Sequence, residues 1–228
     1  ILVVGAGPAG CTVARLLARR GYRVLLAGTP TPAARALANS LPPSTRKLLL
    51  QTDLLDLVEQ VGVRTYGNSV WWGPRDGHEQ SFSADQAAYG YHVDRAALDT
   101  RLLERCRREG VLVDTGVRVQ QVSSAAAGVV ARVLATGAER EIRARLAVDA
   151  SGRAGVIAVP RGLRRYVPGA RAQALIGVWR RTGGWRFRND SHTLIETCDH
   201  GWAWSLPTDD ETRHVGIMCD SASGGRTE

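Results

Sequence analysis

The hydrophobic pattern at the start of the chain predicts a strand, a helix and a second strand. The apolar run ILVV at residues 1–4 is typical of a buried parallel strand. Val13, Leu16 and Leu17 then recur at helical spacing, and Gly21 is a natural helix end. The next apolar run, YRVLLAG, is a second candidate strand. The order of these elements is that of a parallel α/β unit.

A single helix is predicted after the Pro42–Pro43 turn, over residues 44–61. Ser44 is the candidate N-cap because its side-chain oxygen can accept a hydrogen bond from a free amide of the first turn. The apolar positions of this segment recur at helical spacing: Leu48, Leu49, Leu55 and Val58.

A second helix is predicted to begin near Asp94, and a series of short strands follows it. Its apolar face would contain Ala97, Leu98, Leu102 and Cys106. The strand-like pieces after the helix are VLVDTG, VRVQQVSS, GVVARVLATG and EIRARLAVDASG. They predict a β-meander followed by an apolar strand that returns to the first sheet.

From Arg161 onward the pattern predicts antiparallel strands. The candidate strands are ALIGVWRR, HTLIETC, GWAWSLP and RHVGIMCD. Because alternate residues of a strand share a face, Trp202, Trp204 and Leu206 should point the same way. Aromatic residues at this spacing fit a packed core strand as well as the wall of a binding site. The predicted fold class is α/β, a Rossmann-like domain with a β-meander, plus an incomplete antiparallel-sheet domain.

Composition and charge exclude several classes of function. The net charge is +8, but the arginines are dispersed and Lys47 is the only lysine, so we expect no nucleic-acid partner. No apolar run approaches the roughly 20 residues of a membrane span, and we expect a cytoplasmic protein. The cysteines form no CxxC pattern, and the histidines show no metal-ligand spacing and no triad with a serine. We therefore expect neither a metal site nor hydrolase chemistry.

The strongest chemical signal is GAGPAG, which follows the first strand. Gly5, Gly7 and Gly10 have G-x-G-x-x-G spacing, with Pro8 and Ala9 between them. In a strand–turn–helix context, the first glycine permits the tight turn and the second lets backbone approach a pyrophosphate. The third glycine allows the helix to pack closely on the strand, and the helix N-terminus stabilises the phosphate charge.

One position departs from this pattern. A carboxylate is expected at the end of the second strand, where it would hydrogen-bond a ribose hydroxyl, but the sequence there reads LLAGT and places Gly28 at that position. The ribose would then be held by another group, such as Thr29 or Arg35. Otherwise the affinity for a dinucleotide is weakened.

The combination of GAGPAG, HVDRAALDTRLLERC and VDASGR resembles the FAD-binding domain of group A flavin monooxygenases. Flavin-dependent halogenase-like and geranylgeranyl-reductase-like proteins are the most similar relatives. The resemblance implies that Arg95 contacts the dinucleotide. It also implies that Asp149 lies near the pyrophosphate or ribityl chain, with Gly152 permitting close backbone approach. The alternatives are a turn cap for Asp149 and a solvated helix face for Arg95.

The resemblance also implies a domain organisation. Residues 1–62 and 92–158 would form the FAD-binding domain, and residues 63–91 and 159–228 would form part of a substrate domain. The chain starts inside a strand and ends in a polar stretch, and it lacks the Gly-Asp segment that these families carry further along. We therefore expect a fragment of a longer protein.

GWAWSLP resembles the W-x-W-x-I-P signature of flavin-dependent halogenases, with Leu206 in place of isoleucine. The resemblance makes Trp202 and Trp204 candidates for an active-site wall near the flavin. Tryptophan-type halogenases also use a lysine, which should fall near YGNSVWWG, and no lysine occurs there. This absence favours a monooxygenase that oxidises an aromatic or other organic substrate through a flavin C4a-hydroperoxide.

The substrate would be a small molecule or a peptide-borne aromatic group, and the cofactor would be FAD. NAD(P)H, or reduced flavin from a separate flavin reductase, would supply the electrons. A tryptophan-type halogenase is the first alternative. The second alternative is a non-catalytic FAD-binding module. Gly28, which stands where a ribose-binding carboxylate is expected, is compatible with that alternative.

Overall fold

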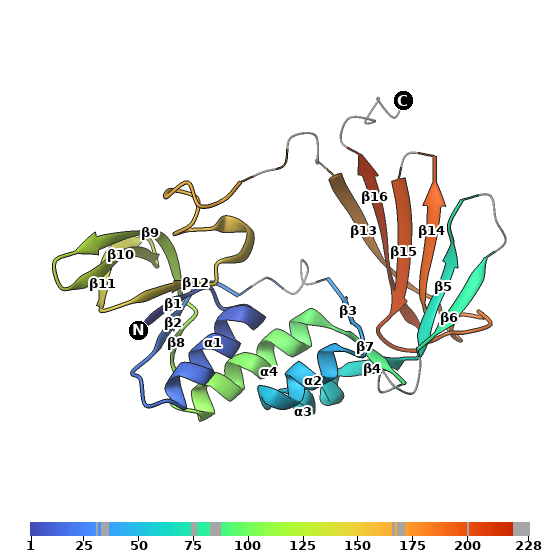
Figure 1. The fold of residues 1–228 in the computed structure, drawn as a ribbon, viewed down its shortest axis with the longest axis horizontal. Helices are drawn as coiled ribbons and strands as arrows, with labels where there is room; N and C mark the ends of the chain where they lie inside the picture. Colours follow the sequence, from blue (N-terminus) through green and yellow to red (C-terminus); the bar gives the residue numbers. More distant parts are fainter. Residues whose placement is uncertain are drawn as a thin grey trace. The chain divides into compact units, whose positions relative to one another are not determined.

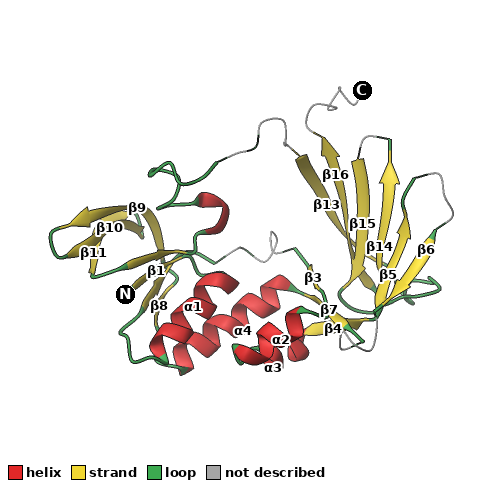
Figure 2. Cartoon of the chain, in the orientation of Figure 1, coloured by secondary structure: helices red, strands yellow, loops and turns green. Residues whose placement is uncertain are grey.

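The computed structural model forms two compact units, drawn as ribbons in Figures 1 and 2. The first unit comprises residues 1–35 and 96–166, and the second comprises residues 36–95 and 167–228. The described residues are 1–30, 32, 37–73, 77–82, 88–165, 167, 172–199 and 201–220. Among these residues, no helix is long and apolar enough to cross a membrane.

The compact units divide the chain differently from the predicted domains. Residues 36–62, predicted as part of the FAD-binding domain, lie in the second unit. There the strand that follows this segment, β4 (Gly62–Thr65), pairs with β7 (Gly90–Val93) in an antiparallel register. The boundaries of the functional domains remain a prediction.

A four-stranded parallel sheet forms one layer of the first unit, in the order β12-β1-β2-β8. Its strands are β1 (Leu2–Val4), β2 (Leu25–Ala27), β8 (Leu112–Asp114) and β12 (Ala147–Asp149). All three residues of β1 are buried, as expected for a short apolar strand in the middle of a parallel sheet. The helices of this unit are α1 (Pro8–Ala18), α4 (Arg95–Arg108) and a 3₁₀ turn at Gly152–Ala154. The strand–helix–strand start predicted from the pattern is confirmed.

The β-meander is confirmed, with one change. Strands β9 (Val117–Ala125), β10 (Gly128–Ala135) and β11 (Ala138–Ala144) form an antiparallel sheet in the order β11-β10-β9. The first predicted piece, VLVDTG, instead joins the parallel sheet as β8, because it pairs with β2. The apolar end of the last piece returns to the first sheet as β12, as predicted, because it pairs with β1.

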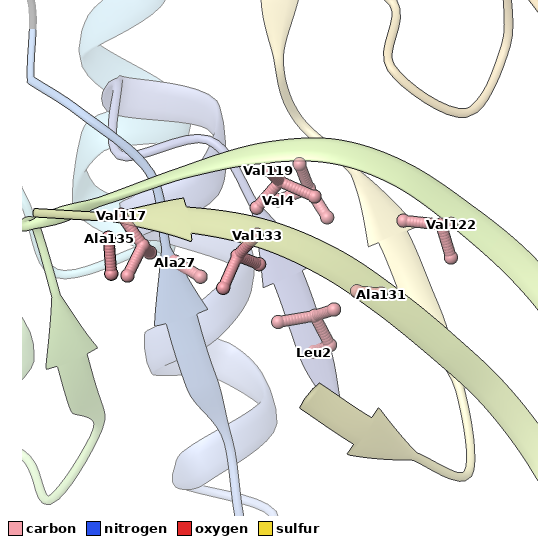
Figure 3. Packing of buried hydrophobic residues seen from close by; sticks show 9 residues of the cluster. All are labelled: Leu2, Val4, Ala27, Val117, Val119, Val122, Ala131, Val133 and Ala135. Atoms are coloured by element: carbon pink, nitrogen blue, oxygen red, sulfur yellow. The ribbon is translucent and has the colours of Figure 1, made fainter. Parts of the chain in front are cut away.

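The core of the first unit lies between the parallel sheet and the meander (Figure 3). Leu2, Val4 and Ala27 come from the parallel sheet. The meander contributes alternate residues of each strand, except that a register irregularity in β9 separates Val119 from Val122 by three positions. These residues are Val117, Val119, Val122, Ala131, Val133 and Ala135.

A buried ion pair also stabilises the first unit. The guanidinium of Arg15, 1% exposed, donates to Glu109 Oε1 from Nε at 3.0 Å and from Nη2 at 2.6 Å. Arg19 donates to the other carboxylate oxygen at 2.8 Å. Burial alone would raise the pKa of Glu109, but the two arginines outweigh it and lower that pKa below its usual value. The pair therefore joins α1 to the end of α4.

The second unit contains two sheets. The smaller sheet is antiparallel, in the order β3-β7-β4, with β3 at Asn39–Leu41. The larger sheet has the order β13-β16-β15-β14-β5-β6. Its strands are β5 (Gly67–Trp71), β6 (His78–Ser81), β13 (Ala172–Arg180), β14 (Thr193–Cys198), β15 (Gly201–Pro207) and β16 (Thr212–Asp220). The antiparallel prediction holds for the last four strands, but β14 pairs with β5 in parallel, which makes the sheet mixed.

The prediction of one helix over residues 44–61 is wrong, because two helices, α2 (Thr45–Gln51) and α3 (Leu55–Val61), occupy the segment. Asp53 has a φ of +53°, and the Leu54 amide donates to the Leu49 carbonyl at 2.8 Å. This pattern is a Schellman-type helix end, which stops α2. Ser44 occupies the N-cap position of α2, as predicted, but its backbone angles are helical and its side chain makes no capping hydrogen bond.

Candidate functional site

In the glycine loop between β1 and α1, nearby backbone atoms leave no room for a side chain at two of the glycines. Gly5 has a φ of +112°, and a Cβ at this position would lie 2.3 Å from the carbonyl oxygen of Ala150. A Cβ at Gly10 would lie 1.9 Å from the carbonyl oxygen of Gly5. Real side chains do not tolerate such distances. Both glycines are therefore required by the fold of the first unit itself.

Gly7 differs from its neighbours because nothing in the protein requires it to be a glycine. Its φ of −88° and ψ of −175° suit any residue, and a Cβ there would meet no atom within 4 Å. Gly7 is the N-cap of α1, and no side chain caps this helix. The first amides of a helix have no intrahelical partner, and those of Ala9 and Gly10 belong to this first turn. Pro8 has no amide hydrogen and suits this first turn.

Gly28 follows β2 at the same edge of the parallel sheet. It is buried, its φ is +156°, and its amide donates to the Asp114 carbonyl at 3.1 Å. A Cβ at Gly28 would lie 3.1 Å from Gly5 Cα and 3.2 Å from the Ala6 amide nitrogen. The close approach of the two turns leaves little room for a side chain at Gly28.

A hollow of about 720 Å³ opens beside these two turns within the first unit. The carboxyl ends of β1 and β2, strand β9 and the loop after β12 all contribute to it. Its lining residues are Val4, Gly5, Ala27, Gly28, Thr29, Arg118, Val119, Gln120, Ser151, Ala154, Gly155, Val156, Val159 and Pro160. Ligands of open parallel sheets bind at this place, outside the carboxyl ends of the strands.

Asp149 ends β12 and organises the loop that borders the hollow. Its Oδ1 accepts hydrogen bonds from the amide of Ser151 at 3.0 Å and from the Ser151 hydroxyl at 2.5 Å. Its Oδ2 accepts from the amides of Ile157 and Ala158, each at 2.9 Å. Burial would raise the pKa of Asp149, but these hydrogen bonds outweigh it and lower that pKa below its usual value. Asp149 therefore stays ionised and holds residues 151–158 in place.

The remaining predicted cofactor residues lie in different surroundings. Gly152 has a φ of +61° and starts the 3₁₀ turn beside the hollow, with open space at its Cβ position. Arg95, the first residue of α4, is grouped with the second unit and donates to Asn39 Oδ1 at 2.9 Å. Arg35 lies outside the described residues. The cofactor contacts of all these residues remain predictions.

Trp202 and Trp204 lie on β15 in the second unit, and both are half-buried. The ring of Trp204 lies over Gly216 of the neighbouring strand, where a Cβ would come within 2.4 Å of Cε2. By strand alternation, Trp202 and the buried Leu206 share this face. The regular strand and its shared face are confirmed, whereas the role of the two tryptophans as an active-site wall remains a prediction.

Sequence reasoning missed an aromatic hollow of about 480 Å³ on the second unit. Ser205 and Arg213 share one face of the sheet, because Nε of the arginine donates to the serine hydroxyl at 2.9 Å. Strand alternation places them on the face opposite the Trp204 ring. The lining residues are Trp71, Trp185, Phe187, Leu194, Glu196, Ala203, Trp204, Ser205, Arg213 and Val215. The signals in the sequence were Trp71 in the strand-like NSVWW and the alternating pair in the loop GGWRF.

Buried polar groups beneath this sheet were also missed. Arg213 is 1% exposed and donates to the backbone oxygens of Asp190 and His192 at 3.0 and 3.1 Å. Burial lowers its pKa to about 10. Ser69 Oγ lies 3.0 Å from His192 Nδ1, a serine–histidine pair that the sequence pattern did not indicate. Both side chains of that pair are buried, which suits a structural hydrogen bond.

His92 is the least solvated of these groups. Its Nε2 lies 2.8 Å from Thr193 Oγ1, and its Nδ1 has no hydrogen-bond partner among the described residues. Burial, followed by the nearby charge of Arg213, lowers the pKa of His92 to about 3. The imidazole is therefore neutral at physiological pH.

Comparison with protein families decides what the glycine loop belongs to. The family model described as an FAD binding domain matches residues 1–224. The chain belongs to the FAD binding domain family. The resemblance inferred from GAGPAG, HVDRAALDTRLLERC and VDASGR is thereby confirmed, as is the predicted fold class.

Several relatives of this FAD binding domain protein are halogenases. A tryptophan 2-halogenase of Chondromyces crocatus is 29% identical over 96% of this chain and 42% of its own length. A chlorinase of Pseudomonas fluorescens that acts on a 1H-pyrrole-2-carbonyl group on a peptidyl-carrier protein is 24% identical over 96% of this chain and 55% of its own. The myxobacterial chondrochloren halogenase has a similar structure, with a TM-score of 0.87, 28% identity and coverage of 97% and 53%. The chain thus spans about half the length of these relatives.

The residues of the first hollow fit the cofactor that the FAD binding domain family implies. The unobstructed Gly7, the uncapped start of α1 and the absence of acidic residues from the described lining all suit a pyrophosphate. No cluster of three potential metal ligands occurs in the described parts of the chain.

Proposed function

We propose that this chain binds FAD in the hollow beside the glycine loop, and that the protein is a flavin-dependent halogenase-type oxidoreductase. The observation that carries the proposal is the difference between the glycines of one loop. The fold itself requires Gly5 and Gly10, whereas the open space at Gly7 suits a ligand that approaches the backbone. The halogenase relatives described above support the same class of enzyme.

The chain's own residues would bind and orient the cofactor. The amides of Ala9 and Gly10 would donate to the pyrophosphate, and the dipole of α1 would stabilise its charge. Asp149 would act indirectly, because its carboxylate holds the loop of Ser151 against the hollow. FAD, when bound, supplies the redox chemistry with oxygen, and the protein contributes position and exclusion of water.

The substrate class follows from the relatives' chemistry. We propose an electron-rich aromatic ring, either free or carried on a peptide or carrier protein, because the relatives named above act on tryptophan and on a carrier-bound pyrrole. Electrons would come from NAD(P)H or from reduced flavin made by a separate flavin reductase. The half-buried face of Trp202 and Trp204 is the proposed wall against which the ring is held.

Oxygenation of the aromatic ring is the second candidate function, and a specific observation favours it. Lys47, the only lysine in the sequence, is an exposed residue of α2. The lysine of tryptophan-type halogenases holds hypohalous acid through its ammonium group. An arginine would be a poor substitute for that lysine, because its charge is delocalised over a planar guanidinium. A monooxygenase needs no such lysine.

One reaction distinguishes the two functions. The purified protein is mixed with FAD, a flavin reductase, NADH, oxygen, sodium bromide and free tryptophan, or with pyrrole-2-carboxylate on a carrier protein. Halogenation predicts a product with the two-isotope mass pattern of bromine, which disappears when bromide is omitted. An oxygenated product that forms equally without bromide would identify a monooxygenase. Protein that binds FAD but gives neither product with any ring would contradict the proposed enzyme.

A further inference from the structure

We propose that Arg118 recognises the adenosine ribose of FAD, in place of the carboxylate that usually ends the second strand. This inference rests on the proposed binding of FAD in the first unit. It names a residue that specifies the dinucleotide, at a position far from the glycine loop in the sequence.

Gly28 stands at the end of β2, where the carboxylate is usually found, and its surroundings disfavour a side chain. Its φ is +156°, and a Cβ there would lie 3.1 Å from Gly5 Cα and 3.2 Å from the Ala6 amide nitrogen. Both close contacts are with backbone, so a side chain would strain the turn that forms the phosphate loop. Because this position carries no carboxylate, ribose recognition needs another source.

The charge of the hollow identifies that source. Its described lining contains no aspartate or glutamate, and Arg118 is its only charged side chain. Asp114, the carboxylate that ends β8, pairs with Ala27 in the sheet but does not line the hollow. Its Oδ1 already accepts a hydrogen bond from the Gly116 amide at 3.1 Å.

Arg118 is also available to a ligand. It is an exposed residue of β9, between the buried Val117 and Val119, and it lines the hollow together with Gln120. Among the described residues, none forms a hydrogen bond or an ion pair with its guanidinium. Thr29, by contrast, already donates its hydroxyl hydrogen to the Val117 carbonyl at 3.3 Å.

With a guanidinium in place of a carboxylate, the hydrogen bonds to the ribose run in the opposite direction. A carboxylate accepts hydrogen bonds from ribose hydroxyls and repels a phosphate at the 2′ position. A guanidinium donates to the hydroxyl oxygens and attracts such a phosphate. The hollow should bind adenosine 2′,5′-bisphosphate more tightly than adenosine 5′-monophosphate, which lacks only the 2′-phosphate.

The test uses isothermal titration of the full chain with four probes: FAD, FMN, adenosine 5′-monophosphate and adenosine 2′,5′-bisphosphate. Arg118→Ala should weaken FAD binding about tenfold, as expected for the loss of a charge-assisted hydrogen bond at an exposed site. It should leave FMN binding unchanged, because FMN lacks the adenosine, and it should remove the preference for the bisphosphate. Arg140→Ala is the matched control, since Arg140 is an exposed arginine of the same sheet outside the hollow.

The results separate this inference from the proposed function. Wild-type protein that binds FAD while Arg118→Ala binds it equally well would overturn the role of Arg118 and leave the proposed function standing. That role is also overturned if Asp114→Asn, rather than Arg118→Ala, weakens FAD binding, or if Arg140→Ala matches the effect of Arg118→Ala. Folded wild-type protein that binds neither flavin would remove the proposed function, and this inference with it.

Discussion

Replacing Gly7 and Gly10 with alanine, one at a time, should separate the glycine that serves the ligand from the glycine that serves the fold. At Gly10 the new Cβ would lie 1.9 Å from the Gly5 carbonyl oxygen, so backbone must move. Overpacking of this kind costs up to about 3 kcal/mol. Alanine regains about 1 kcal/mol because it is the better helix former. We expect Gly10→Ala to lower the free energy of unfolding by about 2 kcal/mol.

At Gly7 the balance is different. The backbone angles suit alanine, and no atom lies within 4 Å of the new Cβ. Alanine is a poorer N-cap than glycine by less than about 1 kcal/mol, and the lower entropy of the unfolded chain offsets part of that loss. Stability should therefore change little. The methyl group would stand where the pyrophosphate approaches, so FAD affinity should fall at least about tenfold, or about 1.4 kcal/mol.

Urea unfolding followed by circular dichroism measures the stability of both variants, and quenching of flavin fluorescence measures their FAD affinity. The matched control is Gly116→Ala, because Gly116 has no positive φ and the atom nearest to the new Cβ would be Asp114 Oδ1 at 3.6 Å. Gly7→Ala protein that binds FAD as tightly as the wild type would refute the ligand role of Gly7. Gly10→Ala protein as stable as the wild type would refute the packing role of Gly10.

Three further predictions concern buried or hydrogen-bonded groups, each of which acts inside one of the two units. Glu109→Gln should lower the free energy of unfolding by about 2–3 kcal/mol, because Arg15 would keep a buried charge, whereas the exposed Glu104→Gln should cost less than about 0.5 kcal/mol in the same urea titration. Asp149→Asn should speed hydrogen exchange of the loop amides that its carboxylate now binds and weaken FAD binding; unchanged exchange would contradict its positioning role. His92 should remain neutral in ¹³C NMR spectra down to about pH 3. In the unfolded chain the imidazole of His92 is protonated below about pH 6.5, whereas in the folded protein it stays neutral down to about pH 3. The contribution of His92 to stability should therefore fall as the pH drops from 6.5 towards 3. A titration midpoint near 6.5 for His92 in the folded protein would refute the burial argument.

The elements of the first unit could be predicted from sequence because their signals are local. ILVV, GAGPAG and the apolar face of residues 13–17 lie within one strand–helix unit, where periodicity and glycine spacing suffice. The break at Asp53 was not predicted, because a left-handed residue other than glycine gives a weak signal in a segment that is otherwise helical. The assignment of VLVDTG to the parallel sheet depended on its pairing with β2, which local pattern does not encode.

The candidate site shows the same division between local and long-range information. The glycine loop was predictable, but the Arg118 side of the hollow was not, since a lone arginine in a strand of alternating pattern carries no signal of what lies opposite. The aromatic hollow combines Trp71 of β5 with Trp185 of the loop before β14, and the pairing of β5 with β14 joins these segments, which are distant in the sequence. Gly28 was identified from its place in the motif, while the reason that a side chain would be strained there required the backbone of Gly5.

A crystal structure of the protein with FAD would test the central claim most directly, because it locates the pyrophosphate. We predict a pyrophosphate oxygen within about 3 Å of the Ala9 or Gly10 amide nitrogen. We also predict the adenosine in the hollow beside Gly28 and Arg118. FAD bound elsewhere, with the start of α1 free of phosphate, would contradict the proposed binding site.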